Sequence, residues 1–202
     1  MPETIVIAGA GHASSQLIAS LRQHEFDGRI VLVGEEPYLP YQRPPLSKTF
    51  LAGESSLDEL YLRADEFYAD ASVELRLNTR IESLDRAAKT LKLNDGDELG
   101  YDKLALTTGS RVRRLPIPGS DLAGIYYLRD IADVEQIQTH VRNGARVVIV
   151  GGGYIGLEVA AVCATRSVDT VVLEMESRVM NRVVAPVVSS FYQERHAAEG
   201  VR

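Results

Sequence analysis

The chain has 202 residues, 45% of them hydrophobic and 25% charged, which is typical of a folded globular protein and not of a disordered one. Its 22 basic and 28 acidic residues give a net charge of −6, without the basic surplus or stripe expected of a nucleic-acid-binding protein. The single cysteine, Cys163, excludes an internal disulfide and a CxxC pair, and four scattered histidines predict no metal site.

Neither a membrane span nor a secretion signal is evident. The apolar runs are far shorter than the roughly 20 residues that a membrane-spanning helix needs. The first residues lack the basic start and apolar core of a signal peptide. We therefore expect a soluble, cytoplasmic protein without a membrane partner.

The first 34 residues predict a βαβ unit. Thr4–Ala8 is an apolar, β-branched run that stops at Gly9, as expected of a strand buried on both faces of a parallel sheet. Apolar residues recur at helical spacing over residues 12–23. Residues 30–33 then form a second buried strand, which ends at Gly34.

The middle of the chain is less regular. Residues 36–50 are rich in proline, which prevents regular structure, and a helix is expected near 64–71. Residues 73–77 alternate as a strand does. Residues 91–93, a turn at 94–96 and a strand over 98–106 predict a small β-meander.

The βαβ pattern restarts about 140 residues after its first occurrence. A helix is expected over 131–141 and a buried strand over 146–150, followed by Gly151-Gly152-Gly153. A second helix over 155–164 then leads to a strand over 170–173, which ends at Glu174. The sequence therefore predicts an α/β fold with two Rossmann-like dinucleotide-binding units and a small β-meander, the second unit being incomplete.

A glycine motif marks the strand–helix junction of each unit. Gly151, Gly153 and Gly156 satisfy GxGxxG, which permits a tight turn, close approach of a pyrophosphate and close helix–strand packing. Glu174 follows the next strand, where a carboxylate accepts hydrogen bonds from ribose hydroxyls and repels a 2′-phosphate. This arrangement favours NAD(H) over NADP(H).

In the first unit Gly9 and Gly11 are present, but Ser14 stands where the third glycine belongs, and Glu35 follows the next strand. Ser14 adds a side chain at the helix–strand contact that would loosen packing without abolishing phosphate binding. The alternative is that both motifs are turns that merely shape the chain.

Four stretches together resemble the ferredoxin reductases of oxygenase and cytochrome P450 systems. They are Gly9-Ala10-Gly11-His12-Ala13, the run at 40–48 that contains RPPLSK, Thr107-Thr108-Gly109, and the segment at 151–158. The resemblance implies FAD in the first unit, over residues 1–118, and NADH in the second, over 119–202. Such enzymes take a hydride from NADH onto FAD and pass single electrons to a small iron–sulfur protein, a ferredoxin or rubredoxin.

The resemblance also implies roles for individual residues. Lys48 would stabilise negative charge on the reduced flavin, paired with Glu158 beside the nicotinamide. The alternatives are a solvated loop lysine and a glutamate favoured by the helix dipole. The residues implied to face FAD are Gly9, Gly11, His12, Ala13, Glu35, Arg43, Lys48, Thr108, Gly109, Arg111 and, more weakly, Arg129. Those implied to face NADH are Gly151, Gly153, Tyr154, Ile155, Gly156, Glu158, Glu174 and Arg178.

Three further residues have ordinary alternatives. Tyr154 would flank the nicotinamide or simply pack, and Arg178 would reach the NADH phosphates or adenosine or lie on the surface. Cys163 lies among small apolar residues and is expected to be a buried apolar residue and not a reactive thiol. The disulfide-reducing relatives need a cysteine pair beside the flavin, and its absence argues against that branch.

The chain departs from this family in length, since family members are roughly twice as long. We expect a fragment of a full reductase. The alternatives are a complete short module that binds a dinucleotide without electron transfer, and a protein whose missing strands come from another chain.

Overall fold

A computed structural model describes residues 2–202, which divide by their internal contacts into two units. Unit 1 combines the residues up to Gln42 with Asp58–Arg111, and unit 2 combines Arg43–Leu57 with Val112–Arg202. The sequence predicted a boundary near residue 118. Which nucleotide each part binds stays a prediction.

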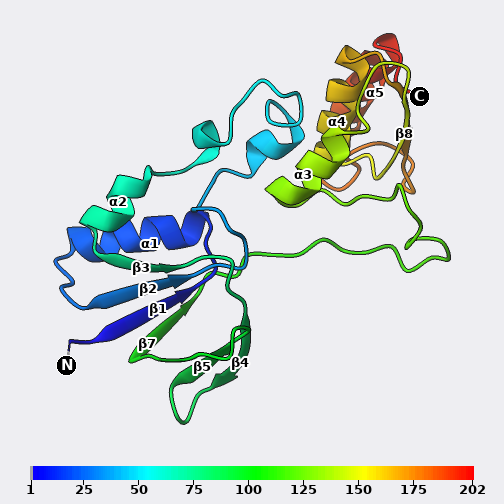
Figure 1. Cartoon of the computed structure of the whole chain (residues 1–202). Helices are drawn as coiled ribbons and strands as arrows, with labels where there is room; N and C mark the ends of the chain where they lie inside the picture. The colour runs from blue at the N-terminus through cyan, green and yellow to red at the C-terminus, as the bar shows by residue number, and fades with distance from the viewer. Residues whose placement is uncertain (1) are drawn as a thin grey trace. The chain divides into compact units, whose positions relative to one another are not determined.

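Unit 1 contains a four-stranded parallel sheet with the strand order β3-β2-β1-β7 (Figure 1). Its strands are β1 (Thr4–Ala8), β2 (Arg29–Val33), β3 (Val73–Arg76) and β7 (Lys103–Leu106). In the central strand Ile5 lies opposite Ile30 on one side and Lys103 on the other. Central β1 and β2 are buried, which explains their unbroken apolar runs.

Both faces of this sheet are covered. Helices α1 (His12–Gln23) and α2 (Asp65–Asp70) lie on one face, where Ile18 and Tyr68 pack against Ile7 and Leu32. An antiparallel meander of β4 (Ile81–Asp85), β5 (Thr90–Leu93) and β6 (Glu98–Gly100) covers the other. There Leu91, Leu93 and Leu99 pack against Val6, Val31 and Val33.

The single strand expected over residues 98–106 is wrong. The structure splits it into β6 and β7, which belong to different sheets. The break falls at Asp102, whose backbone N–H donates to the Thr4 carbonyl at 2.9 Å. The Asp102 carboxylate in turn accepts from the Thr4 N–H at 2.7 Å, so the chain changes sheets where it joins β1.

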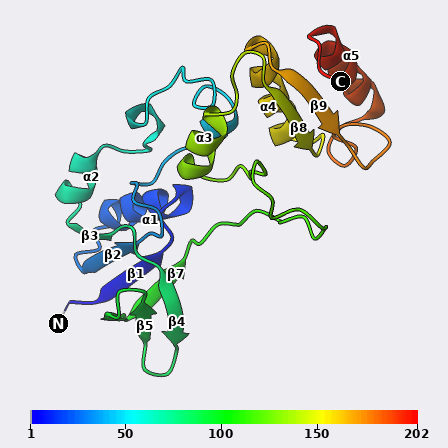
Figure 2. The same ribbon diagram turned by 45° about the vertical axis from the view of Figure 1, so that its right-hand side comes forward.

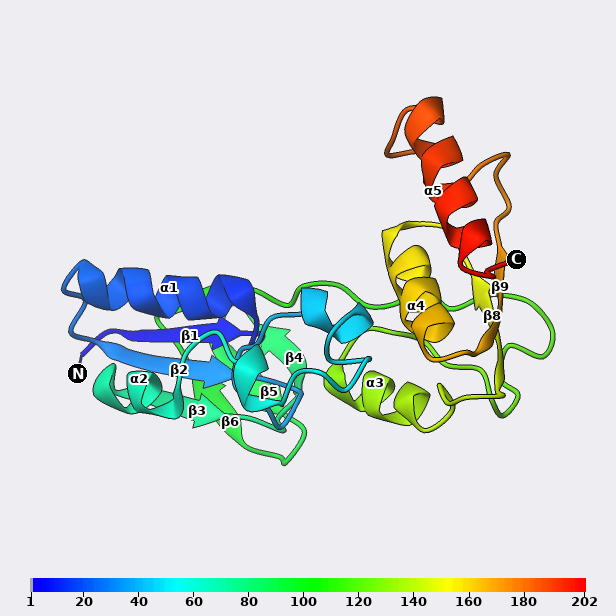
Figure 3. The same cartoon turned by 90° about the horizontal axis from the view of Figure 1, so that it is seen from above.

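Unit 2 contains a parallel pair, β8 (Arg146–Val150) and β9 (Asp169–Leu173), joined through helix α4 (Tyr154–Thr165) (Figure 2). Two further helices are α3 (Ile131–Gln138) and α5 (Pro186–Ala198), and the sequence reasoning had missed α5. The chain end lies beside β9 (Figure 3). There the Val172 N–H donates to the Arg202 carbonyl at 2.7 Å and the Arg202 N–H to the Thr170 carbonyl at 3.0 Å, a parallel pairing that extends the sheet.

The segment at 43–57, which includes Pro44 and Pro45 of the proline-rich run, belongs to unit 2 through specific side-chain contacts. It forms the 3-10 helix η1 (Pro44–Ser47), and a second one, η2 (Asp58–Leu60), follows in unit 1. The Arg43 guanidinium donates to the Arg129 carbonyl at 2.7 Å, and the Gln138 amide donates to the Phe50 carbonyl at 2.5 Å. These bonds fix residues 43–57 against the second unit's helices.

Residues 2–202 contain neither a candidate membrane-spanning helix nor a cluster of metal-ligating side chains. No helix there is long and apolar enough to cross a membrane. In the same residues no group of His, Cys, Asp and Glu side chains gathers as a metal site would require. Cys163 is buried on α4, and burial raises the pKa of its thiol, as expected of a small apolar residue and not of a reactive one.

Candidate functional site: two glycine turns and a lysine–glutamate pair

The first glycine turn follows β1. Gly9 adopts φ +110°, a conformation that favours glycine, and its N–H donates to the Val33 carbonyl at 2.8 Å. A Cβ atom at Gly9 would lie 2.4 Å from the Thr107 carbonyl oxygen and 2.9 Å from the Thr108 Cα. The turn therefore needs glycine for two independent reasons, backbone conformation and space.

Thr107 holds this turn, and sequence reasoning did not assign it a role. Its hydroxyl lies 2.8 Å from the Gly9 carbonyl oxygen and 3.0 Å from that of Ala8. Its N–H also donates to the Ala8 carbonyl at 2.8 Å. The only signal for Thr107 was its place beside Thr108 and Gly109, which were assigned to the flavin nucleotide. Both of these residues are exposed after β7, as is Arg111.

The start of α1 is open to solvent. Gly11 precedes the helix with no atom within 4 Å of the position that a Cβ would take, and His12 and Ala13 are exposed. Ser14 is fully buried, accepting from the Gly11 N–H at 2.8 Å and donating to the Gly11 carbonyl at 2.7 Å. Its side chain thus bonds within the turn, and the expected loosening of the packing is not seen.

The second glycine turn repeats this geometry after β8. Gly151 also has φ +110°, and its N–H donates to the Leu173 carbonyl at 2.8 Å. A Cβ at Gly156 would lie 2.0 Å from the Gly151 carbonyl oxygen, whereas Gly153 faces open space. The space above Gly11 and Gly153 fits a pyrophosphate approaching the backbone, and the first N–H groups of each helix have no partner within the helix.

Glu174 is held against the second turn by backbone donors. Its Oε2 accepts from the Gly152 N–H at 2.7 Å and its Oε1 from the Glu176 N–H at 2.9 Å. The Glu176 N–H, with a smaller contribution from that of Gly152, holds the pKa of this carboxyl below its ordinary value. The carboxylate is therefore charged and fixed, and each oxygen retains capacity for a ribose hydroxyl.

Glu35 does not match Glu174 in register. Glu174 directly follows Leu173, whereas Gly34 stands between Val33 and Glu35. A Cβ at Gly34 would lie 2.6 Å from the Cβ of Ala10, so a side chain there would collide with the turn. The Glu35 side chain is 70% exposed, with Arg80 3.7 Å away.

Lys48 and Glu158 are brought together as the sequence analysis implied. The Lys48 Nζ lies 2.8 Å from Glu158 Oε2 and 3.1 Å from the Pro44 carbonyl oxygen. Ser47 joins them, since its hydroxyl donates to the same Oε2 at 2.5 Å. Sequence reasoning missed Ser47, although it lies inside the RPPLSK run that drew attention to Lys48.

Four other expected site residues lie as follows. Tyr154 and Ile155 open α4 and are about half exposed. Arg43 contacts the backbone of Arg129, so these two are adjacent. Their contacts with a nucleotide stay predictions.

Arg178 binds its own loop. Its guanidinium donates to the carbonyls of Asn181 and Val184, both at 2.9 Å, and to the Ser189 hydroxyl at the start of α5. These bonds tie the segment after Glu174 to α5. A contact with NADH would use the donors that remain.

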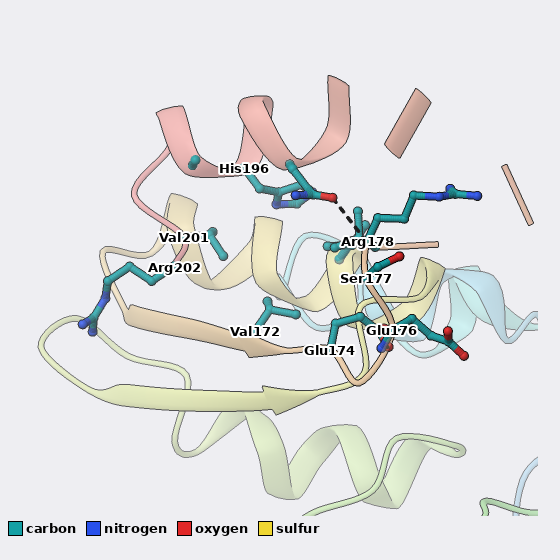
Figure 4. A pocket seen from close by; sticks show the side chains of 12 residues that line it. Val172, Glu174, Glu176, Ser177, Arg178, His196, Val201 and Arg202 are labelled. Atoms are coloured by element: carbon teal, nitrogen blue, oxygen red, sulfur yellow. Dashed lines mark hydrogen bonds between the residues drawn. The ribbon is translucent and has the colours of Figure 1, made fainter. Parts of the chain in front are cut away.

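A cavity of about 470 Å³ lies between β9 and α5 (Figure 4). Glu174, Glu176 and Arg178 lie toward one end, and Arg202 toward the other. His196 faces it from α5, where burial lowers the pKa of the imidazole. None of the turn glycines lines this cavity.

Residues 3–202 match the pyridine nucleotide-disulphide oxidoreductase family. The chain belongs to this family. It is 42% identical over 199 residues to the probable ferredoxin reductase CtmF of Castellaniella defragrans, covering 98% of this chain and 49% of that protein. It is 39% identical over 198 residues to rhodocoxin reductase of Rhodococcus erythropolis, covering 98% and 46%.

Solved structures give the same result. The covalent putidaredoxin reductase–putidaredoxin complex matches with a TM-score of 0.93 and 39% identity, over 98% of this chain and 48% of that one. The ferredoxin reductase for the CYP199A2 system of Rhodopseudomonas palustris matches with a TM-score of 0.93 and 40% identity, over 99% and 49%. The α/β fold and the resemblance to ferredoxin reductases are confirmed, and the chain spans about half the length of these relatives.

Proposed function

We propose that this chain is the nucleotide-binding part of an NADH-dependent ferredoxin reductase, with FAD in the first unit and NADH in the second. The observation that carries the proposal is the repeated turn. Gly9 and Gly151 share φ +110° and a 2.8 Å hydrogen bond to the end of the next strand. Two such turns, each opening a helix, suit an enzyme that binds two dinucleotides.

In the first unit the pyrophosphate of FAD would lie against Gly11 and the exposed start of α1, at His12 and Ala13. Glu35, exposed after β2, would accept from the FAD ribose. Thr108 and Gly109 would border the same nucleotide, and Arg111 would supply positive charge toward its phosphates or ribitol. Arg43 and Arg129 belong to unit 2, and the same role for them rests on the resemblance alone. The similarity to the probable ferredoxin reductase CtmF and to rhodocoxin reductase supports this assignment.

In the second unit the NADH phosphates would lie at Gly153 and the N-terminus of α4. Glu174, held by two backbone N–H groups, would accept the adenosine ribose hydroxyls and repel a 2′-phosphate. Glu158 lies one turn into the same helix, where it would face the nicotinamide. The geometry thus favours NADH over NADPH.

Lys48 would supply the positive charge that stabilises a reduced flavin. Bound FAD would accept a hydride from NADH and release electrons singly to a ferredoxin or rubredoxin. Lys48 would supply a positive charge to the ring, and its ammonium lies 2.8 Å from Glu158 Oε2. The structure of a relative bound to putidaredoxin supports a partner of this kind.

The test is the visible absorption spectrum of the 202-residue chain, purified, titrated with FAD and then given NADH without oxygen. We expect a bound-flavin band that bleaches on addition of NADH and recovers when an oxidised ferredoxin is added. Gly11→Val serves as the matched variant, since its side chain would fill the open space at the first turn. It should lose flavin binding and keep NADH binding.

The alternative is a module that binds a dinucleotide without electron transfer. It would bind NADH, take up no FAD and stay colourless. A chain that binds neither nucleotide would overturn both functions. In that case the turns would only record the family to which the chain belongs.

A further inference from the structure

Two donors from consecutive residues converge on one oxygen of Glu158. The Ser47 hydroxyl donates to Oε2 at 2.5 Å, and the Lys48 ammonium lies 2.8 Å from the same atom. No hydrogen bond to Oε1 occurs among residues 2–202. The carboxylate therefore has one engaged oxygen and one oxygen left available as an acceptor.

The two donors differ in how firmly they are held. Ser47 is 4% exposed at the end of η1, a 3-10 helix that begins with two prolines. Lys48 has a flexible side chain that is 47% exposed, and its ammonium also donates to the Pro44 carbonyl. A buried hydroxyl on a short side chain has few alternative positions, whereas an exposed lysine has many. The serine is therefore the donor that holds Oε2 more firmly.

We propose that Ser47 is a positioning residue for Glu158. By holding Oε2, its hydroxyl keeps Oε1 directed away from η1 and ready to accept a hydrogen bond from the carboxamide of a bound nicotinamide. It also keeps the half-buried carboxylate partnered whenever the Lys48 ammonium turns toward another negative group. This inference deepens the proposed function and rests on NADH binding at α4.

The test measures the dissociation constant of NADH for the chain, in a double-mutant cycle of Ser47→Ala and Glu158→Gln. A hydrogen bond to a charged group carries enough free energy for about a tenfold effect, so Ser47→Ala should weaken NADH binding by about that factor. In the Glu158→Gln background the same change should have little further effect, since both act through one contact. Ser47→Thr, which retains the hydroxyl, should restore most of the affinity.

Thr165→Ala is the matched control. It removes a hydroxyl from the same helix as Glu158, where it bonds only the local Val162 carbonyl at 2.8 Å. It should leave NADH binding within about twofold of the unchanged chain. Circular dichroism of each variant shows whether it is folded, and Ser47→Cys, which keeps the volume with a weaker donor, replaces Ser47→Ala if that variant does not fold.

The outcomes separate the two proposals. If the unchanged chain binds no NADH, the proposed function fails. If it binds NADH and Ser47→Ala binds equally well, only the role of Ser47 is overturned. Equal losses from Ser47→Ala in both backgrounds would show a general packing effect and would also overturn it.

Discussion

The two glycine turns reach one backbone geometry with different residues. Gly9 is confined by the backbone of Thr107, whereas a Cβ at Gly151 would meet nothing within 4 Å. Conversely, Gly156 has no room for a side chain, while Ser14 fills that place in the first turn and bonds to Gly11. The motif therefore does not demand each glycine for the same reason in both units.

The two units also differ in the pair formed by the middle residue of the turn and the first residue after the next strand. In the first unit Ala10 faces Gly34, and in the second Gly152 faces Glu174. Each pair contains one glycine, because the two positions lie too close for two larger side chains. In unit 2 the turn residue Gly152 leaves room for the Glu174 side chain directly after β9. In unit 1 Ala10 occupies the equivalent space, so Gly34 follows β2 and the carboxylate comes one residue later, at Glu35.

The parallel sheets of the two units differ in how far their strands are buried. Val6 of β1 is fully buried beneath the meander, whereas its counterpart Val148 of β8 is 54% exposed and Val150 is 61% exposed. Helix α4 lies along β8 and β9, and these valines stay exposed on the sheet. Two similar β-branched strands, TIVIA in β1 and RVVIV in β8, thus contribute to a core in one unit and to a surface in the other.

Substitution of the first glycine of each turn by alanine should give the largest difference in stability loss between the two units. Gly9→Ala combines an unfavourable φ with a collision against backbone atoms, so we expect a loss of roughly 3 kcal/mol or more in unit 1. Gly151→Ala has only the unfavourable φ and should cost roughly 1–2 kcal/mol in unit 2. Hydrogen exchange read by mass spectrometry reports β1 and β8 separately. Equal losses would contradict the steric account of Thr107.

Truncation of the equivalent valines, Val6 in β1 and Val148 in β8, should give the next largest difference in stability loss. Val6→Ala leaves a cavity between sheet and meander and should lower the free energy of unfolding of unit 1 by about 2 kcal/mol. Val148→Ala removes an exposed side chain and should cost about 0.5 kcal/mol or less. Urea denaturation followed by circular dichroism measures both. A large loss from Val148→Ala would mean that this face is covered in solution.

Removal of the Ser14 hydroxyl should have a smaller effect. Ser14→Ala leaves the Gly11 N–H without its acceptor and should cost about 1 kcal/mol, as for a lost helix cap. Flavin affinity should change little, since the open approach above Gly11 is retained. Ser20→Ala on the same helix is the control, because its hydroxyl accepts from the Gln16 amide at a longer 3.3 Å. Loss of flavin with unchanged stability would show that Ser14 acts on the ligand.

The smallest effect concerns acid pH. Because the folded pKa of Glu174 is lowered, its charge stabilises unit 2 above its ordinary pKa of about 4.3, and this contribution is lost as the pH falls through the folded value. Glu174→Gln should therefore be less stable than the unchanged chain at pH 7, with the gap narrowing toward pH 3. Thermal denaturation across this range measures it.

The sequence was sufficient to predict the elements that carry local signals. The apolar runs that end at Gly9 and Gly151 predicted β1 and β8, because a buried parallel strand before a glycine turn is distinctive. Helix α5 was missed because its apolar residues, among them Phe191 and Val187, stay exposed and mark no core face.

The contacts that complete the site depend on distant residues. Thr107 reaches Gly9 across 98 positions, and Ser47 reaches Glu158 across 111. No local pattern encodes such pairs, so their discovery required the fold. The pairing of Lys48 with Glu158 was foreseen only through the resemblance to ferredoxin reductases.

The membership of residues 43–57 in unit 2 has a consequence for synthesis. The chain enters this segment from unit 1 and returns to unit 1 at Asp58. Because Arg43 bonds to Arg129 and Ser47 to Glu158, the partners of this segment are made only 86 to 111 residues after it. Residues 43–57 therefore remain without these partners while the earlier part of unit 1 is made. A cut at the predicted boundary near residue 118 would separate that segment from its partners for good.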